Sequence, residues 1–182
     1  PGQDLKSWQE TMAYAVQLGV EHLSLYGLTI EEGTPLKAMV ERGVYPHPDD
    51  DLAADMYEAA MDYLAGRGFL HYEISNWAKK RGQQWMTCQH KLQYWRNLPY
   101  FGFGAGAHAY HSGRRAANVP GIVAYIERIR QGVFSFPEGP AVESSIMIDR
   151  KAEMQETMMV GLRLLVEGVS RAGFEKRFGI AI

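Results

Sequence analysis

Residues that can ligate a metal or hold a flat cofactor gather after Cys88. The stretch CQHKLQYW places a thiol, an imidazole and the pair Tyr94 and Trp95 within eight residues. Thiolate and imidazole groups suit transition metals and haem iron, and aromatic rings stack well on flat ligands. This segment therefore indicates a cofactor site, although the residue types alone do not say which cofactor it takes.

A glycine-rich run, FGFGAGAHAY, follows a few residues later. Gly102, Gly104 and Gly106 alternate with Phe103 and Ala105, and alternation is the period of a β-strand. Glycine along one side of a strand marks a place where a ligand or another backbone comes close. We therefore expect a strand built for close approach beside the soft and aromatic groups.

Each of these features also has a structural interpretation. A lone cysteine is more often a small buried hydrophobic residue, so a packing role is favoured for Cys88. For His90 the two interpretations are balanced, and Tyr94 and Trp95 are more often core residues than parts of a cofactor site. The glycine run does not fit a dinucleotide-binding loop, because that loop opens a helix and this run is itself strand-like.

Composition and charge are those of an ordinary globular chain. The 182 residues suffice for one domain with a core, or for one domain and a small part of another. A net charge of −2 provides no overall basic field for nucleic acid. No apolar run approaches the ~20 residues of a membrane helix, and one cysteine forms no intramolecular disulfide. A reducing, cytoplasmic compartment is the simplest interpretation. Because the chain begins at Pro1 and stops just after a helical pattern, we interpret it as a fragment of a longer protein.

Hydrophobic periodicity and end signals predict the elements around these residues. A short helix is expected over 36–42, strands over 20–30 and 69–75, and a loop over 76–87. The alternation of helices and strands in the first half favours a parallel α/β sheet. Further helices are expected to begin at capping residues, namely Asp4, Asp49 or Asp50, Asn118 with Pro120 in the first turn, Asp149, and Ser170.

Taken together, several segments resemble a known protein family. In order, the chain contains PGQ, HLSLYGLTIEEGTPL, YEISNWAK, a C-x-H-x-x-x-YW pattern, GFGAGAHAY, an RR-x-x-N pattern and ETMMVGLRL. This series resembles the C-terminal part of the oxygen-independent coproporphyrinogen III oxidase-like radical SAM proteins, and within them the HemW-type haem-chaperone branch. The resemblance covers essentially the whole chain, and HLSLYGLTIEEGTPL is its most specific segment.

The resemblance implies an α/β fold. In this family a partial (β/α) barrel of parallel strands, covered by outer helices, is followed by a smaller and mainly helical C-terminal domain. Residues 1–145 would be the C-terminal part of the radical SAM barrel with its extension, and residues 146–182 would begin a truncated C-terminal domain. An exposed barrel edge would allow self-association through an open strand.

The resemblance also implies ligand sites. The haem site of the chaperone branch is a His-Asn-x-x-Tyr-Trp motif, which His90, Tyr94 and Trp95 match, with His90 as the candidate ligand of the haem iron. Lys91 stands where the motif has asparagine, and pairing with a haem propionate is a hypothesis for it. Residues at the ends of late strands would line the S-adenosylmethionine pocket, namely Leu28, Thr29, Gly104, Gly106, Ala107 and His108.

Two functions remain open at this point. One is a haem chaperone that binds haem and transfers it to recipient proteins. The other is an oxidase that converts coproporphyrinogen III propionates to vinyl groups with S-adenosylmethionine as oxidant. The family's three cysteines for a [4Fe–4S] cluster are absent, and one cysteine cannot replace three ligands, so we expect no catalytic residues here and no activity of the chain alone. The His90 motif favours the chaperone.

Overall fold

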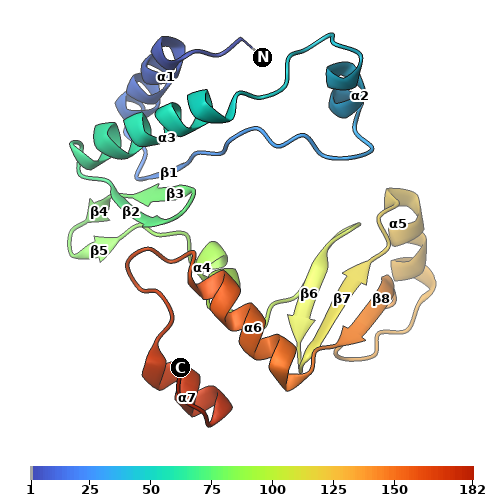
Figure 1. The fold of residues 1–182 in the computed structure, drawn as a ribbon. Helices are drawn as coiled ribbons and strands as arrows, with labels where there is room; N and C mark the ends of the chain where they lie inside the picture. The colour runs from blue at the N-terminus through green and yellow to red at the C-terminus, as the bar shows by residue number, and fades with distance from the viewer. Residues whose placement is uncertain (1) are drawn as a thin grey trace. The chain divides into compact units, whose positions relative to one another are not determined.

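The chain forms two compact units (Figure 1). The computed structural model describes residues 2–182. One unit ends at Thr87, and the other runs from Cys88 to Ile182. Each unit has its own sheet and its own helices. The sequence predicts a domain boundary elsewhere, between residues 145 and 146. That boundary stays a prediction. None of the described helices is long and apolar enough to cross a membrane.

Three helices belong to the first unit, and all three were predicted. They are α1 (Leu5–Gln17), α2 (Pro35–Glu41) and α3 (Asp50–Ala65). The Asp4 carboxylate accepts a hydrogen bond from the Ser7 amide at 2.8 Å, and Asp49 caps α3 in the same way. Helix α1 packs against α3, where the Trp8 indole donates to the Met56 carbonyl at 2.8 Å.

The sheet of the first unit is antiparallel, so the predicted parallel sheet is wrong. Strands β1 (His22–Ser24), β3 (Asn76–Ala78) and β2 (Leu70–Glu73) lie in that order, with β3 antiparallel to both neighbours. Only two residues join β2 to β3, and so short a connection forces antiparallel pairing. The sheet is open, so the described residues do not close a barrel. The strand predicted over 20–30 is correspondingly short.

The prediction of a loop over residues 76–87 is also wrong. This segment holds β3 and a small hairpin of β4 (Lys80–Arg81) and β5 (Gln84–Trp85). Its polar composition conceals a buried strand, because Trp77 is fully buried and Asn76 is held by the side chains of Ser24 and Glu73. A single large aromatic residue therefore anchors a strand that periodicity does not reveal.

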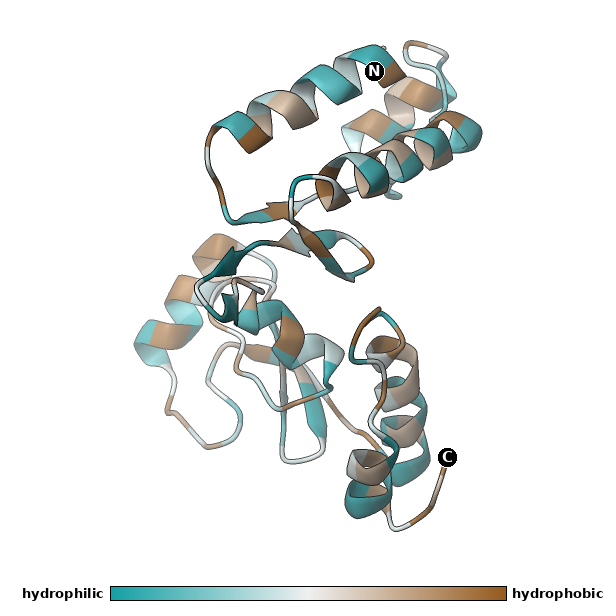
Figure 2. Ribbon diagram, turned by 90° about the vertical axis from the view of Figure 1, so that its left-hand side faces the viewer, coloured by the Kyte–Doolittle hydropathy of each residue, from teal (hydrophilic) through white to brown (hydrophobic). Residues whose placement is uncertain are grey.

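The core of the first unit lies between this sheet and the helices above it (Figure 1). Leu64, Phe69 and Trp77 form a buried cluster. The His71 imidazole stacks on the Trp77 ring with their centroids 4.0 Å apart. Along α1 and α3, hydrophobic and hydrophilic bands alternate (Figure 2), as expected of helices that bury one face. The partly buried residues around the cluster are Val16, Leu23, Leu25, Tyr57 and Tyr63.

The second unit combines a three-stranded antiparallel sheet with four helices. In the sheet, β7 lies between β6 and β8. Helix α4 packs against α6. The predicted caps Asp149 and Ser170 are confirmed at the starts of α6 and α7. The elements are α4 (Gln89–Trp95), β6 (His108–His111), β7 (Arg114–Asn118), α5 (Ile122–Gln131), β8 (Val142–Met147), α6 (Arg150–Gly161) and α7 (Arg171–Phe178).

Two predictions in the second unit are wrong. The glycine run is a turn rather than a strand, because Gly104 and Gly106 have φ values of 107° and 69°, a region that glycine enters easily. Strand β6 begins only at His108. Asn118 does not cap a helix: it ends β7, and α5 begins at Ile122 after Gly121.

The Asp149 cap gives a test of local stability in the second unit. Its carboxylate accepts from the Ala152 amide at 2.8 Å. We expect Asp149→Ala to lower the free energy of unfolding by about 1 kcal/mol, because the first turn of α6 loses this acceptor. Urea unfolding followed by circular dichroism measures the change. Asp149→Ser keeps an acceptor and should cost much less; equal losses in both variants would contradict the capping role.

Candidate functional site

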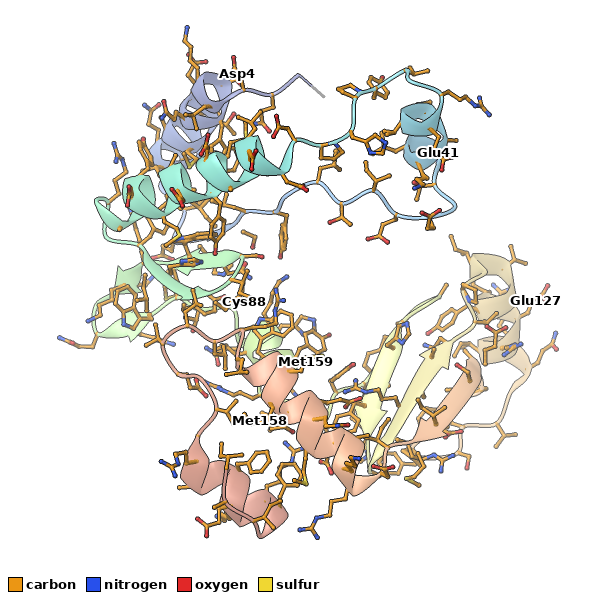
Figure 3. All side chains as sticks on the ribbon, viewed as in Figure 1. Asp4, Glu41, Cys88, Glu127, Met158 and Met159 are labelled. Carbon is orange, nitrogen blue, oxygen red and sulfur yellow. The ribbon has the colours of Figure 1, made fainter. Side chains whose placement is uncertain are left out.

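The segment that matches the haem motif forms helix α4. Cys88 is its N-cap residue and lies at the start of the helix (Figure 3). Leu92 is buried beneath the helix, which fixes the face that α4 turns toward the rest of its unit. Gln89 and His90 are exposed. The helix therefore presents the motif histidine to solvent from a short and anchored element.

His90 and Tyr94 lie one helical turn apart and touch. The His90 Nε2 atom and the Tyr94 hydroxyl are 2.9 Å apart, and the two rings meet edge to face with centroids separated by 4.7 Å. Residues four apart share a helix face, which is why the sequence spacing brings them together. When Nε2–H donates to the tyrosine oxygen, Nδ1 carries the lone pair that a metal accepts.

The tyrosine is itself held from the other side. Its ring meets the Tyr100 ring edge to face, with centroids 4.5 Å apart and planes at 89°. The Tyr100 backbone forms a β-bridge with Tyr110, the buried residue of β6. The pair of His90 and Tyr94 is thus connected to the sheet of the second unit through aromatic contacts.

Trp95 belongs to a different environment. The Arg163 guanidinium lies 4.4 Å from its ring, and its indole nitrogen is buried with no hydrogen-bond partner among the described residues. Trp95 also borders a cavity of about 240 Å³ lined by residues of α6, α7 and the segment between them, such as Leu164 and Phe174. The structure therefore joins His90 to Tyr94, whereas the third motif residue packs between helices.

A buried asparagine fixes the C-terminal end of α4. Asn97 is 3% exposed and has a φ of 48°, a conformation that asparagine tolerates better than most residues. Its amide donates to the Thr157 hydroxyl at 3.0 Å, and its side-chain oxygen accepts from Arg115 at 3.4 Å. Its carbonyl accepts from Arg177 at 3.0 Å. One residue therefore ties α4 to β7, α6 and α7.

The four second-unit candidates for the S-adenosylmethionine pocket lie together in the turn before β6 and at its first residue. They are Gly104, Gly106, Ala107 and His108. The Asn118 amide donates to the carbonyls of Gly102 and Gly104 at 3.1 and 3.0 Å. A Cβ atom on Gly102 would lie 2.3 Å from the His108 carbonyl oxygen. The glycines predict that a ligand or another backbone comes close to this segment. At Gly102 it is the backbone of His108, in the same chain, that comes close.

The other two candidates for that pocket belong to the first unit. Leu28 and Thr29 are exposed and follow β1 in a segment without regular structure. Leu28 borders a cavity of about 730 Å³, which has the size of a small-molecule site. Aromatic and apolar side chains dominate its lining, among them Trp8, Tyr45 and Met56. Thr29 is not among the lining residues.

A row of buried polar side chains in the first unit was not predicted. Glu73 is fully buried, and one of its oxygens accepts from the Ser75 amide at 3.1 Å and from the Asn76 side chain. The Ser24 hydroxyl donates to Asn76. The second Glu73 oxygen has no hydrogen-bond partner within residues 2–182. Strand pairing across β1, β3 and β2 assembles this row, and the order of residues in the sequence does not show it.

Neither Cys88 nor His90 belongs to a three-ligand metal site among the described residues. Among residues 2–182, no three side chains of His, Cys, Asp or Glu lie close enough together to hold a metal ion. With a single cysteine in the sequence, the chain also lacks the three thiolates of a [4Fe–4S] site.

Comparison with known proteins finds relatives over nearly the whole chain. No protein-family model matches it. It is 36% identical over 179 residues to "Heme chaperone HemW" of Bacillus subtilis (strain 168), covering 98% of this chain and 44% of the relative. It is 32% identical over 186 residues to the protein of the same name in Lactococcus lactis, covering 98% of this chain and 46% of the relative. The chain thus spans less than half the length of these curated relatives.

One solved structure shares the fold. Coproporphyrinogen III oxidase (HemN) from Escherichia coli, described as a radical SAM enzyme, matches 99% of this chain and 42% of its own chain with a TM-score of 0.70. The sequence identity is 14%, so the match shows the fold alone. The mixed α/β arrangement expected from the sequence is confirmed, and it matches part of the fold of that enzyme.

Replacing Asn97 tests whether it holds α4. We expect Asn97→Ala to lower the free energy of unfolding by about 2–4 kcal/mol, because it strains the left-handed backbone and leaves buried groups of Thr157 and Arg115 without a partner. Asn97→Gly relieves the backbone strain but not the lost hydrogen bonds, so its effect should be smaller. Urea unfolding measures both; a loss below 0.5 kcal/mol in the alanine variant would contradict the anchoring role.

Tyr110 gives a pH test of the same network. Its hydroxyl donates to Glu153 at 3.0 Å, and burial, together with this carboxylate, raises the pKa of Tyr110 above its ordinary value of 10.0. A raised pKa in the folded state means that the stabilisation is complete below about pH 10 and is lost as the pH rises through the folded-state pKa. Comparing urea midpoints at about pH 8 and about pH 11, we expect Tyr110→Phe to show a smaller alkaline loss than the parent chain. Equal losses would contradict this assignment.

Proposed function

The chain is homologous to the HemW haem chaperones, and from this homology we propose that it binds haem and takes part in its transfer to recipient proteins. The observation that carries the proposal is the pair of His90 and Tyr94 on α4. An exposed imidazole held by a neighbouring hydroxyl is a ready axial ligand for haem iron.

In this proposal each motif residue has its own task. His90 donates a ring nitrogen to the haem iron, and the Tyr94 hydroxyl accepts the proton of the other nitrogen, which orients the ring. Trp95 acts through packing, because it anchors α4 against the helices behind it. Lys91, at the position of the motif asparagine, pairs with a haem propionate. Exposure of His90 favours release as well as capture, since a transferred ligand must leave.

We propose that S-adenosylmethionine binds in the larger radical SAM protein. Leu28 and Thr29 of the first unit are candidate contacts for it, and so, separately, is the turn from Gly104 to His108 of the second unit. The turn supports this role because a Cβ atom on Gly104 would have no heavy atom within 4 Å, so a ligand can come close to the backbone there. A [4Fe–4S] cluster supplies electrons in radical SAM chemistry, but this chain has one cysteine. We therefore assign no reaction step to residues of this chain.

A haemin titration tests the proposal. With up to one equivalent of haemin added to the purified chain, we expect a saturable shift of the Soret band. His90→Ala should weaken this binding by about tenfold, or 1.4 kcal/mol, because the iron loses its protein ligand. Tyr94→Phe should bind haemin with an altered band position, since the ring keeps its place but loses the hydroxyl.

Gln89→Ala is the matched control, because it shortens the neighbouring exposed side chain of the same helix. It should bind haemin like the parent chain. Circular dichroism verifies that each variant retains its helices. If His90→Ala binds haemin with the parent's affinity and spectrum, the proposed ligand is wrong. Lys91→Ala tests the propionate contact separately, and unchanged affinity there would remove Lys91 from the site.

A further inference from the structure

A second histidine of the same unit lies in a group of exposed aromatic rings. Phe101, Phe103 and Phe136 are 50%, 84% and 61% exposed, although phenylalanine is usually withdrawn from water. The Phe101 ring lies 6.4 Å from that of Phe103 and 6.2 Å from that of Phe136, between centroids. Two separate loops thus bring three phenyl rings to one place on the surface.

His111 lies between two of these rings. Its imidazole stacks on Phe101 with a centroid distance of 5.1 Å and an angle of 17°, and it meets Phe136 edge to face at 5.0 Å and 78°. The Ser112 hydroxyl lies 2.7 Å from Nδ1. When Nδ1–H donates to this hydroxyl, Nε2 carries the free lone pair. The two rings fix the plane of the imidazole, and the contact of Ser112 with Nδ1 leaves Nε2 as the nitrogen that can meet a ligand.

We propose that His111, Phe101 and Phe136 form a second haem-binding site. A metalloporphyrin is flat and largely apolar, and its central metal accepts an imidazole nitrogen. It therefore uses both features of the group, the apolar surface of the phenyl rings and the lone pair of Nε2. A lipid or an apolar peptide would use only the rings. The proposal rests on the haem function proposed above and adds a second contact to it.

The two histidines are connected within the second unit. The ring of Tyr94 contacts Tyr100, and the backbone amide of Tyr100 donates to the Tyr110 carbonyl at 2.7 Å, one residue before His111. Phe101, which stacks on His111, directly follows Tyr100. Aromatic residues and one β-bridge therefore link both sites.

Stoichiometry is the test. Haemin is titrated past two equivalents into the purified parent chain, His111→Ala, His90→Ala and the double variant. We expect two equivalents of the parent's affinity for the parent, one such equivalent for each single variant and none for the double variant, whose binding is weakened at both sites. Phe136→Ser should weaken the second equivalent by about tenfold. Phe134→Ser is its matched control, because Phe134 is 67% exposed on the same loop, and it should leave both equivalents in place.

Metal-free protoporphyrin IX separates iron ligation from stacking. It should bind His111→Ala and the parent chain equally, since it cannot use Nε2. One equivalent of haemin in both the parent and His111→Ala would overturn the second site and leave the His90 proposal intact. If instead His90→Ala has no effect and His111→Ala abolishes binding, the His90 proposal fails and the His111 site stands. If Phe134→Ser and Phe136→Ser both lose the second equivalent of haemin, the assignment of Phe136 to the second haem site is also overturned.

Discussion

The second unit depends on one buried polar residue, Asn97. It ends α4 in a left-handed conformation, and its side chain and carbonyl bond to residues of three other elements. A buried polar group is tolerated only when its hydrogen bonds are made, so these elements must stay in register for Asn97 to remain buried. Helix α4 has only seven residues and would be marginal alone. Its anchored end is what gives His90 a fixed place.

A second network strengthens the same region. Arg115 pairs with Glu156 at 2.6 Å, and Arg177 pairs with Glu153. Glu153 also accepts from the Tyr110 hydroxyl. These half-buried ion pairs matter more than isolated surface pairs, because they share partners and geometry. The sheet, α6 and α7 thereby form the rigid support from which α4 presents its histidine, a requirement for any site that must recognise a ligand repeatedly.

Features set by neighbouring residues could be predicted from the sequence. The caps Asp4, Asp149 and Ser170 are confirmed because capping involves residues only three apart. The contact of His90 with Tyr94 follows from the helical spacing of α4, a helix that the sequence analysis did not predict. The direction of the third motif residue, Trp95, could not be predicted, since it depends on how α6 and α7 pack.

Features set by distant residues were missed or wrong. The alternating glycines suggested a strand, but positive φ values at Gly104 and Gly106 make a turn, and Asn118 from β7 holds it. The buried strand around Trp77 was hidden by polar neighbours that pair only in the folded sheet. The ring contacts of His111 join two loops and β6, so no local pattern could reveal them.

The most direct measurement of the central claim is nuclear magnetic resonance of the chain with its six histidines isotopically labelled. Haemin is paramagnetic and broadens signals close to the iron, whereas gallium protoporphyrin is a diamagnetic control. The account predicts that one equivalent of haemin broadens the His90 side-chain signals, whereas gallium protoporphyrin leaves them sharp. His90 signals that stay equally sharp with haemin and with gallium protoporphyrin would contradict it.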